Sequence, residues 1–245
     1  MVTSEGNNAR ISGEGQLAGG TYGAVTINGA GSVKGDIACG TLRINGAGTA
    51  AGSVKADVLV VNGTASFGRE IQAGEMTVNG DASITEGLGV GRLRIKGRCF
   101  VGGGIAAHEV DSKGELVVGT DCAADRFLAE GAFTIGGLLN ADSIDIRLHA
   151  SCKAREIGGD KITVRQGRGL ASVITFFTDK RLTADSIEAD EVDLEYVTAK
   201  VVRGKHVTIG EGCTIDLVEY VDDFKQGAGA SVGSAVKIVR EIGED

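Results

Sequence analysis

The 245-residue chain contains 40 glycines, no proline and no tryptophan, and its aromatic residues are seven phenylalanines and three tyrosines. Because 42% of the residues are hydrophobic, the chain is too apolar for a glycine-rich disordered linker. The absence of proline and of a Gly-X-Y period excludes collagen. A formal net charge of −8 disfavours nucleic acid as a partner, since phosphate binding requires clustered Lys and Arg.

The sequence carries no sign of export or membrane insertion. No run of about 18 consecutive apolar residues occurs, so a transmembrane helix is not expected. Residues Met1–Asn8 lack the basic and apolar regions of a secretory signal. The odd number of five cysteines favours reduced thiols over a disulfide framework. We therefore expect a cytoplasmic protein.

A repeat of seventeen residues follows a predicted tail at 1–9 and a predicted first coil at 10–25. From Thr26 to Ile144 the sequence divides into seven blocks of seventeen, and the eighth, twelfth and seventeenth positions of each block are apolar in nearly every case. Glycine occupies the fourth position of all seven blocks, at Gly29, Gly46, Gly63, Gly80, Gly97, Gly114 and Gly131. Such an internal period is typical of a solenoid.

Apolar residues within a block are separated by two positions, as in Leu42 with Ile44 and Ala65 with Phe67. This spacing is the side-chain period of a β-strand, and glycine at this density disfavours helix. Each block therefore predicts three short strands joined by tight corners and stacked on the next block as a parallel β-helix. The glycine column marks a corner that needs either a positive φ or close backbone stacking.

The predicted β-helix is one continuous domain over 10–239, with regular coils over 10–162 and about thirteen coils in all. A coil at 163–182 contains an excursion loop, further coils follow over 183–239, and 240–245 form a tail. Within the excursion, an apolar run is flanked by basic residues, and its candidate contact residues are Leu170, Ile174, Phe176 and Phe177. Three roles stay open for this run: folding back on the solenoid, a contact between subunits, or a peripheral contact with a membrane surface.

No catalytic, cofactor-binding or metal-binding residues are predicted, and we expect a protein that is not an enzyme. The cysteines fall mostly at inward positions and are expected to be core residues. The histidines lie in different coils, so no base is placed beside a nucleophile. The Gly-Ala-Gly segments at 29–31 and 46–48 recur in phase with the solenoid and are not followed by a helix, as a dinucleotide-binding fingerprint requires.

Two features of the sequence resemble bactofilins, the polymer-forming cytoskeletal proteins of bacteria. The first is the run of glycine-cornered coils, such as Ile44-Asn45-Gly46 and Ile84-Thr85-Glu86-Gly87. The second is Ala199–Tyr220, which is similar to the C-terminal part of longer bactofilin-like proteins from Gram-positive bacteria. The resemblance implies a right-handed, three-faced β-helix that assembles end to end into filaments without nucleotide. It also implies a scaffold that recruits envelope, motility or positioning proteins.

Unpaired strand edges at the two ends of a solenoid favour such assembly, because they must be capped or paired. The candidate contact residues are Ile11, Leu17 and Tyr22 at one end and Phe224, Val232 and Val236 at the other. Two alternatives stay open. One is a β-helical enzyme of the acyltransferase or carbohydrate-active type, which seventeen-residue coils and the scarcity of aromatic residues disfavour. The other is a binding module that does not polymerise.

Overall fold

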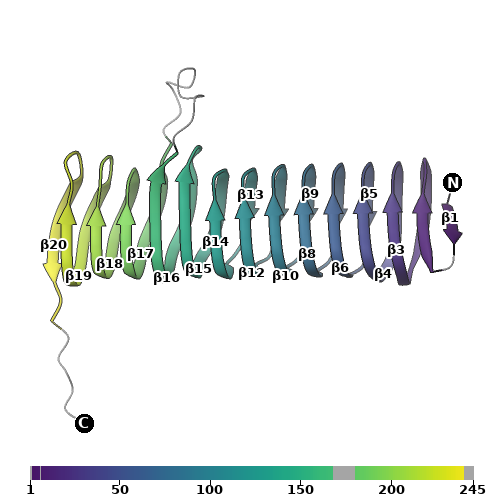
Figure 1. Ribbon diagram of the computed structural model, residues 1–245, viewed down its shortest axis with the longest axis horizontal. Helices are drawn as coiled ribbons and strands as arrows, with labels where there is room; N and C mark the ends of the chain where they lie inside the picture. The colour runs from purple at the N-terminus through teal and green to yellow at the C-terminus, as the bar shows by residue number, and fades with distance from the viewer. Residues whose placement is uncertain (1, 6, 168–179, 240–245) are drawn as a thin grey trace, which may run out of the picture. The chain divides into compact units, whose positions relative to one another are not determined.

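The computed structural model describes residues 2–5, 7–167 and 180–239, and within them it is all-β (Figure 1). The chain forms two compact units, Met1–Ala124 and Asp125–Asp245. Each unit is a parallel β-solenoid whose strands stack coil upon coil, which confirms the predicted fold class. Among the described residues, no helix has the length and apolar character needed to cross a membrane.

The first unit opens with β1 (Val2–Glu5) and β2 (Asn8–Ile11), where a tail had been expected. The two strands pair antiparallel, with Val2 opposite Ile11, and β2 pairs parallel with β3 (Glu14–Ile27). The following strands are β4 (Ala30–Ile44), β5 (Ala47–Ala50), β6 (Val54–Val61), β7 (Thr64–Phe67), β8 (Ile71–Val78), β9 (Asp81–Ile84), β10 (Leu88–Ile95), β11 (Arg98–Val101), β12 (Ile105–Ser112) and β13 (Glu115–Val118). From β4 onward they pair parallel at a spacing of seventeen residues.

Each regular coil consists of a four-residue strand and an eight-residue strand that bends. The strands β6 and β8 pair from Val54 with Ile71 to Val61 with Val78, but the pairing skips Asp57 and Gly74. The bend at this skipped position divides the long strand into two sides, so the three predicted strands per coil are present as two segments. Inward residues of both segments are buried and form a narrow core of aliphatic side chains.

The glycine column arises from close stacking of the backbone at one corner. A Cβ on Gly63 would lie 2.0 Å from the carbonyl oxygen of Gly46, and one on Gly80 would lie 2.1 Å from that of Gly63. None of the glycines in this column has a positive φ. Of the two predicted reasons for the column, close approach is therefore the correct one, and the glycines are vertical neighbours.

An asparagine ladder runs beside this glycine column. The side-chain amide of Asn45 donates to the side-chain oxygen of Asn28 at 2.8 Å, Asn62 donates to Asn45 at 2.7 Å, and Asn79 donates to Asn62 at 2.8 Å. Because each amide is both donor and acceptor, identical residues stacked in register satisfy one another. The ladder thus joins successive coils through side-chain hydrogen bonds, while the glycines allow the backbones of these coils to approach closely.

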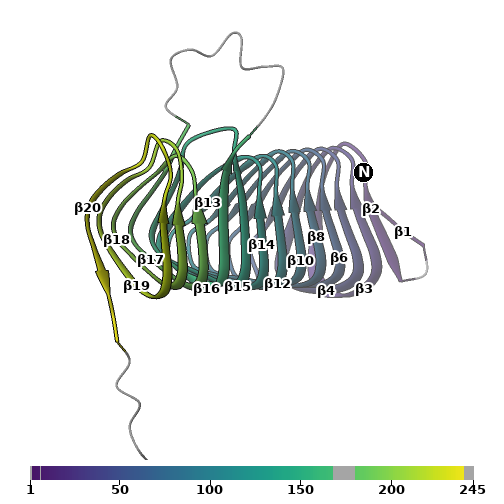
Figure 2. The ribbon, with the colours of Figure 1, turned by 60° about the vertical axis from the view of Figure 1, so that its left-hand side comes forward.

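The strand β14 (Cys122–Ala129) carries the chain from the first unit into the second. The second unit then contains β15 (Ala132–Leu148), β16 (Cys152–Gln166), β17 (Leu182–Leu194), β18 (Val197–Ile209), β19 (Thr214–Gln226) and β20 (Ser231–Lys237). Its strands are long and bend around the coil, as Figure 2 shows for β16 to β19. Coil length varies here: Ile144 pairs with Ile162, and Leu182 pairs with Val197. Cys152 of β16 pairs with Leu182 of β17, and this wide spacing in sequence reflects the residues inserted between the two strands.

Candidate functional site: the C-terminal end of the second unit

Buried cysteines are structural residues here and not nucleophiles. All five thiols are buried and unpaired to one another, as the sequence predicts for core residues. Burial raises the pKa of Cys99 and of Cys122 to about 12, so both thiols stay protonated at neutral pH. Within residues 2–5, 7–167 and 180–239, no group of three or more His, Cys, Asp or Glu side chains is arranged to hold a metal ion.

The N-terminal end of the first unit is covered by its own chain. Ile11 is fully buried and pairs with Val2 of β1, and Leu17 is 9% exposed. Tyr22 is half-buried, and its hydroxyl donates to the carbonyl of Ala18 at 3.1 Å. The structure therefore places two of the three predicted contact residues of this end in the core.

The C-terminal end of the second unit carries an incompletely covered strand. On its outer side, β20 pairs with the first half of β19, from Thr214 with Ser231 to Tyr220 with Lys237, and the Ile238 amide donates to the Tyr220 carbonyl at 2.7 Å. The second half of β19 pairs with β18 on its inner side, through His206 with Asp223 and Val207 with Phe224. In the described part of the chain, no strand pairs with the outer side of 222–226.

Apolar side chains gather at this same end. Phe224 and Val232 are half-buried, and the Phe224 ring packs on that of Tyr220 with centroids 5.5 Å apart. Val236 is 49% exposed, and the adjoining Ile238 and Val239 are 40% and 81% exposed. The three residues predicted for this end therefore lie on the last two described strands, Phe224 on β19 and Val232 and Val236 on β20, and exposed Ile238 and Val239 follow directly. The predicted contact residues Leu170, Ile174, Phe176 and Phe177 lie outside the described residues.

Charge alternates from coil to coil toward this end. The strand β16 carries four basic and two acidic residues, and β17 carries five acidic residues and no Lys or Arg. The strand β18 carries Lys200, Arg203, Lys205 and His206 without an acidic residue, and β19 carries Asp216, Glu219, Asp222 and Asp223 with one lysine. In the sequence, the acidic stretch from Asp185 to Glu195 is followed on the next coil by the basic residues from Lys200 to His206, which predicts pairing across the ladder, and the structure confirms it between β17 and β18. The extension of the alternation to β16 and β19 becomes visible only when the coils are placed in register.

Ion pairs join each coil to the next. Lys161 of β16 donates to Glu191 of β17 at 2.6 Å. Between β17 and β18, Lys200 pairs with Asp185 at 2.7 Å and Lys205 pairs with Asp190 at 2.6 Å. Between β18 and β19, Arg203 donates to Glu219 at 2.5 Å, and the Nδ1 of His206 lies 2.9 Å from an Asp223 carboxylate oxygen.

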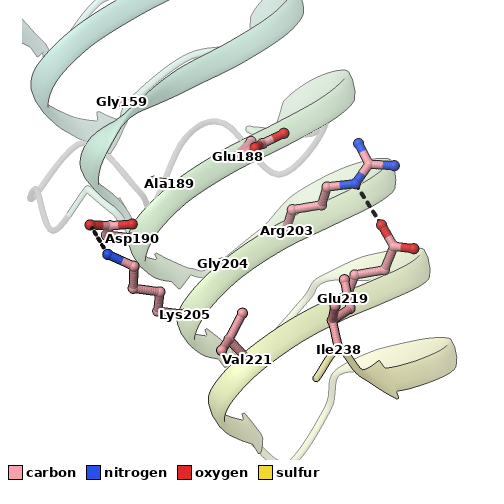
Figure 3. Close-up of a pocket in the computed structure, with 10 residues that line it drawn as sticks. All are labelled: Gly159, Glu188, Ala189, Asp190, Arg203, Gly204, Lys205, Glu219, Val221 and Ile238. Carbon is pink, nitrogen blue, oxygen red and sulfur yellow. Dashed lines mark hydrogen bonds and ion pairs between the residues drawn. The ribbon is translucent and has the colours of Figure 1, made fainter. Parts of the chain in front are cut away.

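A shallow hollow of about 250 Å³ crosses these coils at a bend of the strands (Figure 3). Its floor is formed by small residues, Gly159, Ala189 and Gly204, which are stacked in register. The ion pairs Asp190–Lys205 and Arg203–Glu219 lie on opposite sides of this floor, and Val221 and Ile238 line it toward the C-terminal end. Two carboxylates of the hollow are thus paired with basic groups, Glu188 adds a third carboxylate, and Val221 and Ile238 form its apolar end.

Comparison with known proteins identifies relatives of part of this chain. The chain is 40% identical over 105 residues to the uncharacterized protein YhbE of Bacillus subtilis (strain 168), which covers 42% of this chain and 44% of that protein. It is 46% identical over 87 residues to the uncharacterized protein YhbF of the same strain, covering 34% of each. The chain thus spans less than half the length of these curated relatives. No protein-family model and no solved structure matches it.

Proposed function

We propose that this chain is a structural scaffold that assembles end to end, without nucleotide, into filaments through the terminal coils of its β-helix, and that it recruits partners at the cell envelope or the motility apparatus. The observation that carries the proposal is the C-terminal end of the second unit. There, the side chains of Val236, Ile238 and Val239 are exposed on the last described strand and directly after it. Burial of this apolar area against a second copy stabilises an end-to-end contact.

Two further observations support a scaffold. The sequence resembles bactofilins in its glycine-cornered coils and in Ala199–Tyr220. The solenoid is also stiffened along its stacking direction by backbone ladders, by the asparagine ladder in the first unit and by the ion pairs in the second. Because each coil contacts only its neighbours, such a stack can be extended at its ends without a conformational change inside it.

Electron microscopy of the purified chain tests this function. We expect filaments in the presence and in the absence of ATP or GTP. The variant V236S/I238S/V239S should form fewer and shorter filaments, because it removes exposed apolar area without changing the core. Its thermal unfolding should match that of the unmodified chain.

Phe100→Ser is the matched control, since Phe100 is 46% exposed on a strand of the first unit away from this end in sequence. The control variant should form filaments as the unmodified chain does. An unmodified chain that stays monomeric at every salt concentration would contradict the scaffold and favour a β-helical binding module.

A further inference from the structure

The acidic residues of β17 and β19 differ in how many basic neighbours they have. In the interior, Glu191 lies in register between Lys161 of β16 and His206 of β18. At the end of the column, Asp223 lies in register with His206 on its inner side, and its outer side faces no described strand. On the outer side of β19, the described chain supplies one basic residue, Lys237 of β20, whose Nζ donates to the Asp222 backbone carbonyl at 3.4 Å. No described basic strand lies in register outside Asp223, unlike the interior coil β17, which has basic strands on both sides.

The pKa values of the interior carboxyls reflect basic neighbours on both sides. The hydrogen bond from Lys161 lowers the pKa of Glu191, and the charge of His206 acts in the same direction from the opposite coil. Likewise, the hydrogen bond from Lys200 lowers the pKa of Asp185, with Lys153 and Arg155 contributing from β16. An acidic coil in this solenoid is thus stabilised by basic coils on its two faces.

A second copy of this chain does not supply such a coil at either of its ends. Its own C-terminal coil carries Asp222 and Asp223, so two such ends would place like charges together. Its N-terminal strands β1, β2 and β3 contain Arg10 as their one basic residue, together with Glu5 and Glu14. Charge complementarity therefore favours a different chain as the occupant of this edge.

We propose that the uncovered half of β19, residues 222–226, binds a basic extended segment of a recruited partner protein by strand addition. The added strand would form backbone hydrogen bonds along the outer edge of β19 and would place Lys or Arg beside Asp222 and Asp223. An apolar side chain of the added strand would pack near Phe224, which is half-buried beside Tyr220. This mode takes its affinity from the main chain and its specificity from side chains at fixed positions. The inference rests on the proposed function in that the partner is one that the scaffold recruits, and its edge at 222–226 is distinct from Val236, Ile238 and Val239, which carry the proposed assembly.

The chain itself provides matched peptide probes. Residues 203–209 (RGKHVTI) are basic, and residues 188–194 (EADEVDL) are their acidic counterparts on the neighbouring strand, in register from Glu188–Arg203 to Leu194–Ile209. The two peptides share apolar residues at the fifth and seventh positions and differ in charge at four of the remaining ones. A third peptide has the basic sequence with N-methyl groups on the backbone nitrogens of its fourth and sixth residues, which prevents strand pairing.

Hydrogen exchange of the full chain, measured by mass spectrometry over 221–226, reads out binding at this edge. We expect the basic peptide to slow exchange there at low salt, and less so as the salt concentration rises. The acidic and the N-methylated peptides should have no effect. The variant D222N/D223N should need a roughly fivefold higher concentration of the basic peptide, because two exposed ion pairs are lost.

The control variant E70Q/E86Q makes the same change in net charge at exposed residues of the first unit, and it should behave as the unmodified chain does. Equal protection by the basic and acidic peptides, or by the N-methylated peptide, would overturn the inference. Protection without peptide that rises with protein concentration would identify a second copy as the occupant. Protection without peptide that is lost when 240–245 are removed would identify the chain's own terminus, and either result would also overturn it.

The peptide assay and the microscopy fail independently. Filaments from a chain that does not bind the basic peptide would retain the scaffold and remove this inference. Binding of the basic peptide by a chain that forms no filaments would retain the strand-addition site and contradict the proposed assembly.

Discussion

Single residues of the first unit show how little space the stacked corners leave. The glycine column brings backbone atoms of successive coils so close that any side chain must displace the backbone of the coil below. The same constraint holds at some glycines outside the column, such as Gly119, where a Cβ would lie 2.1 Å from the Gly102 carbonyl oxygen, but it does not hold at every glycine. Gly63 and Gly87 illustrate the difference, since a Cβ would lie 2.0 Å from a carbonyl oxygen at the first and 3.5 Å from one at the second.

Gly63→Ala should therefore lower the stability of the chain. We expect a loss of about 2 to 3 kcal/mol, because the clash is with backbone that cannot move without breaking the ladder. Urea unfolding monitored by circular dichroism measures this loss. Gly87→Ala should leave the midpoint unchanged or slightly raised, since alanine restricts the unfolded chain. Equal effects of the two substitutions would show that stacking does not explain the column.

Ser112 is an exception within an otherwise apolar column. Its side chain is fully buried opposite Ile95, and its hydroxyl has no hydrogen-bond partner among the described residues. Because an unsatisfied buried hydroxyl costs free energy, Ser112→Ala should stabilise the chain by about 1 kcal/mol. Thermal unfolding tests this, with the exposed Ser66→Ala as the control that should change little. A lower midpoint for Ser112→Ala would mean that the hydroxyl is satisfied.

At the scale of strands, the alternating charges of the second unit specify how its coils align. The coils there vary in length, so the seventeen-residue period no longer fixes which residues face each other. Opposite charges on β16 and β17, and again on β18 and β19, favour the observed neighbours. Any exchange of adjacent coils would place carboxylates against carboxylates, which is unfavourable in directly opposed strand positions. Individual exposed pairs are weak, so their effect on alignment comes from their number.

These ion pairs make stability depend on pH. The carboxyls of Glu191 and Asp185 have pKa values lowered by hydrogen bonds from Lys161 and Lys200. A pKa that is lower in the folded state stabilises the fold above the unfolded value and loses that effect as the pH falls through the folded value. Stability should therefore decrease from about pH 5 downward, most clearly at low salt.

Glu191→Gln should reduce this acid sensitivity while slightly lowering stability at neutral pH. Unfolding midpoints between about pH 3 and pH 7 provide the measurement. Glu70→Gln is the matched control, because Glu70 is exposed in the first unit, and it should leave the pH profile unchanged. A profile that Glu191→Gln leaves unaltered would show that its pair with Lys161 does not contribute.

At the scale of the whole molecule, the two chain ends differ in how far their terminal strands are covered by another strand. The N-terminal end places the antiparallel strand β1 over its first coil and buries Ile11. The C-terminal end leaves half of β19 without an outer strand in the described chain and exposes apolar residues beside it. The proposed assembly and partner binding both depend on this difference. The serine variants at Val236, Ile238 and Val239 test it, because they change exposed apolar side chains and leave the buried core as it is.

The sequence alone determined the coil. Glycine and apolar residues recurring every seventeen positions define the spacing, and a side-chain period of two leaves strands as the consistent local structure. The buried positions of Cys99, Cys122 and the aliphatic columns follow from the same periodicity. Such features are predictable because each depends on residues within one block and on its repetition.

Only the tertiary structure decided how the ends are covered and which individual acidic and basic side chains pair. The antiparallel pairing of Val2 with Ile11 depends on a reversal of chain direction that no period encodes. Arg203 lies between Glu188 and Glu219 in register, and its guanidinium donates to Glu219. The choice of partner depends on side-chain conformation in the assembled coils, because stacking brings together residues that are distant in sequence.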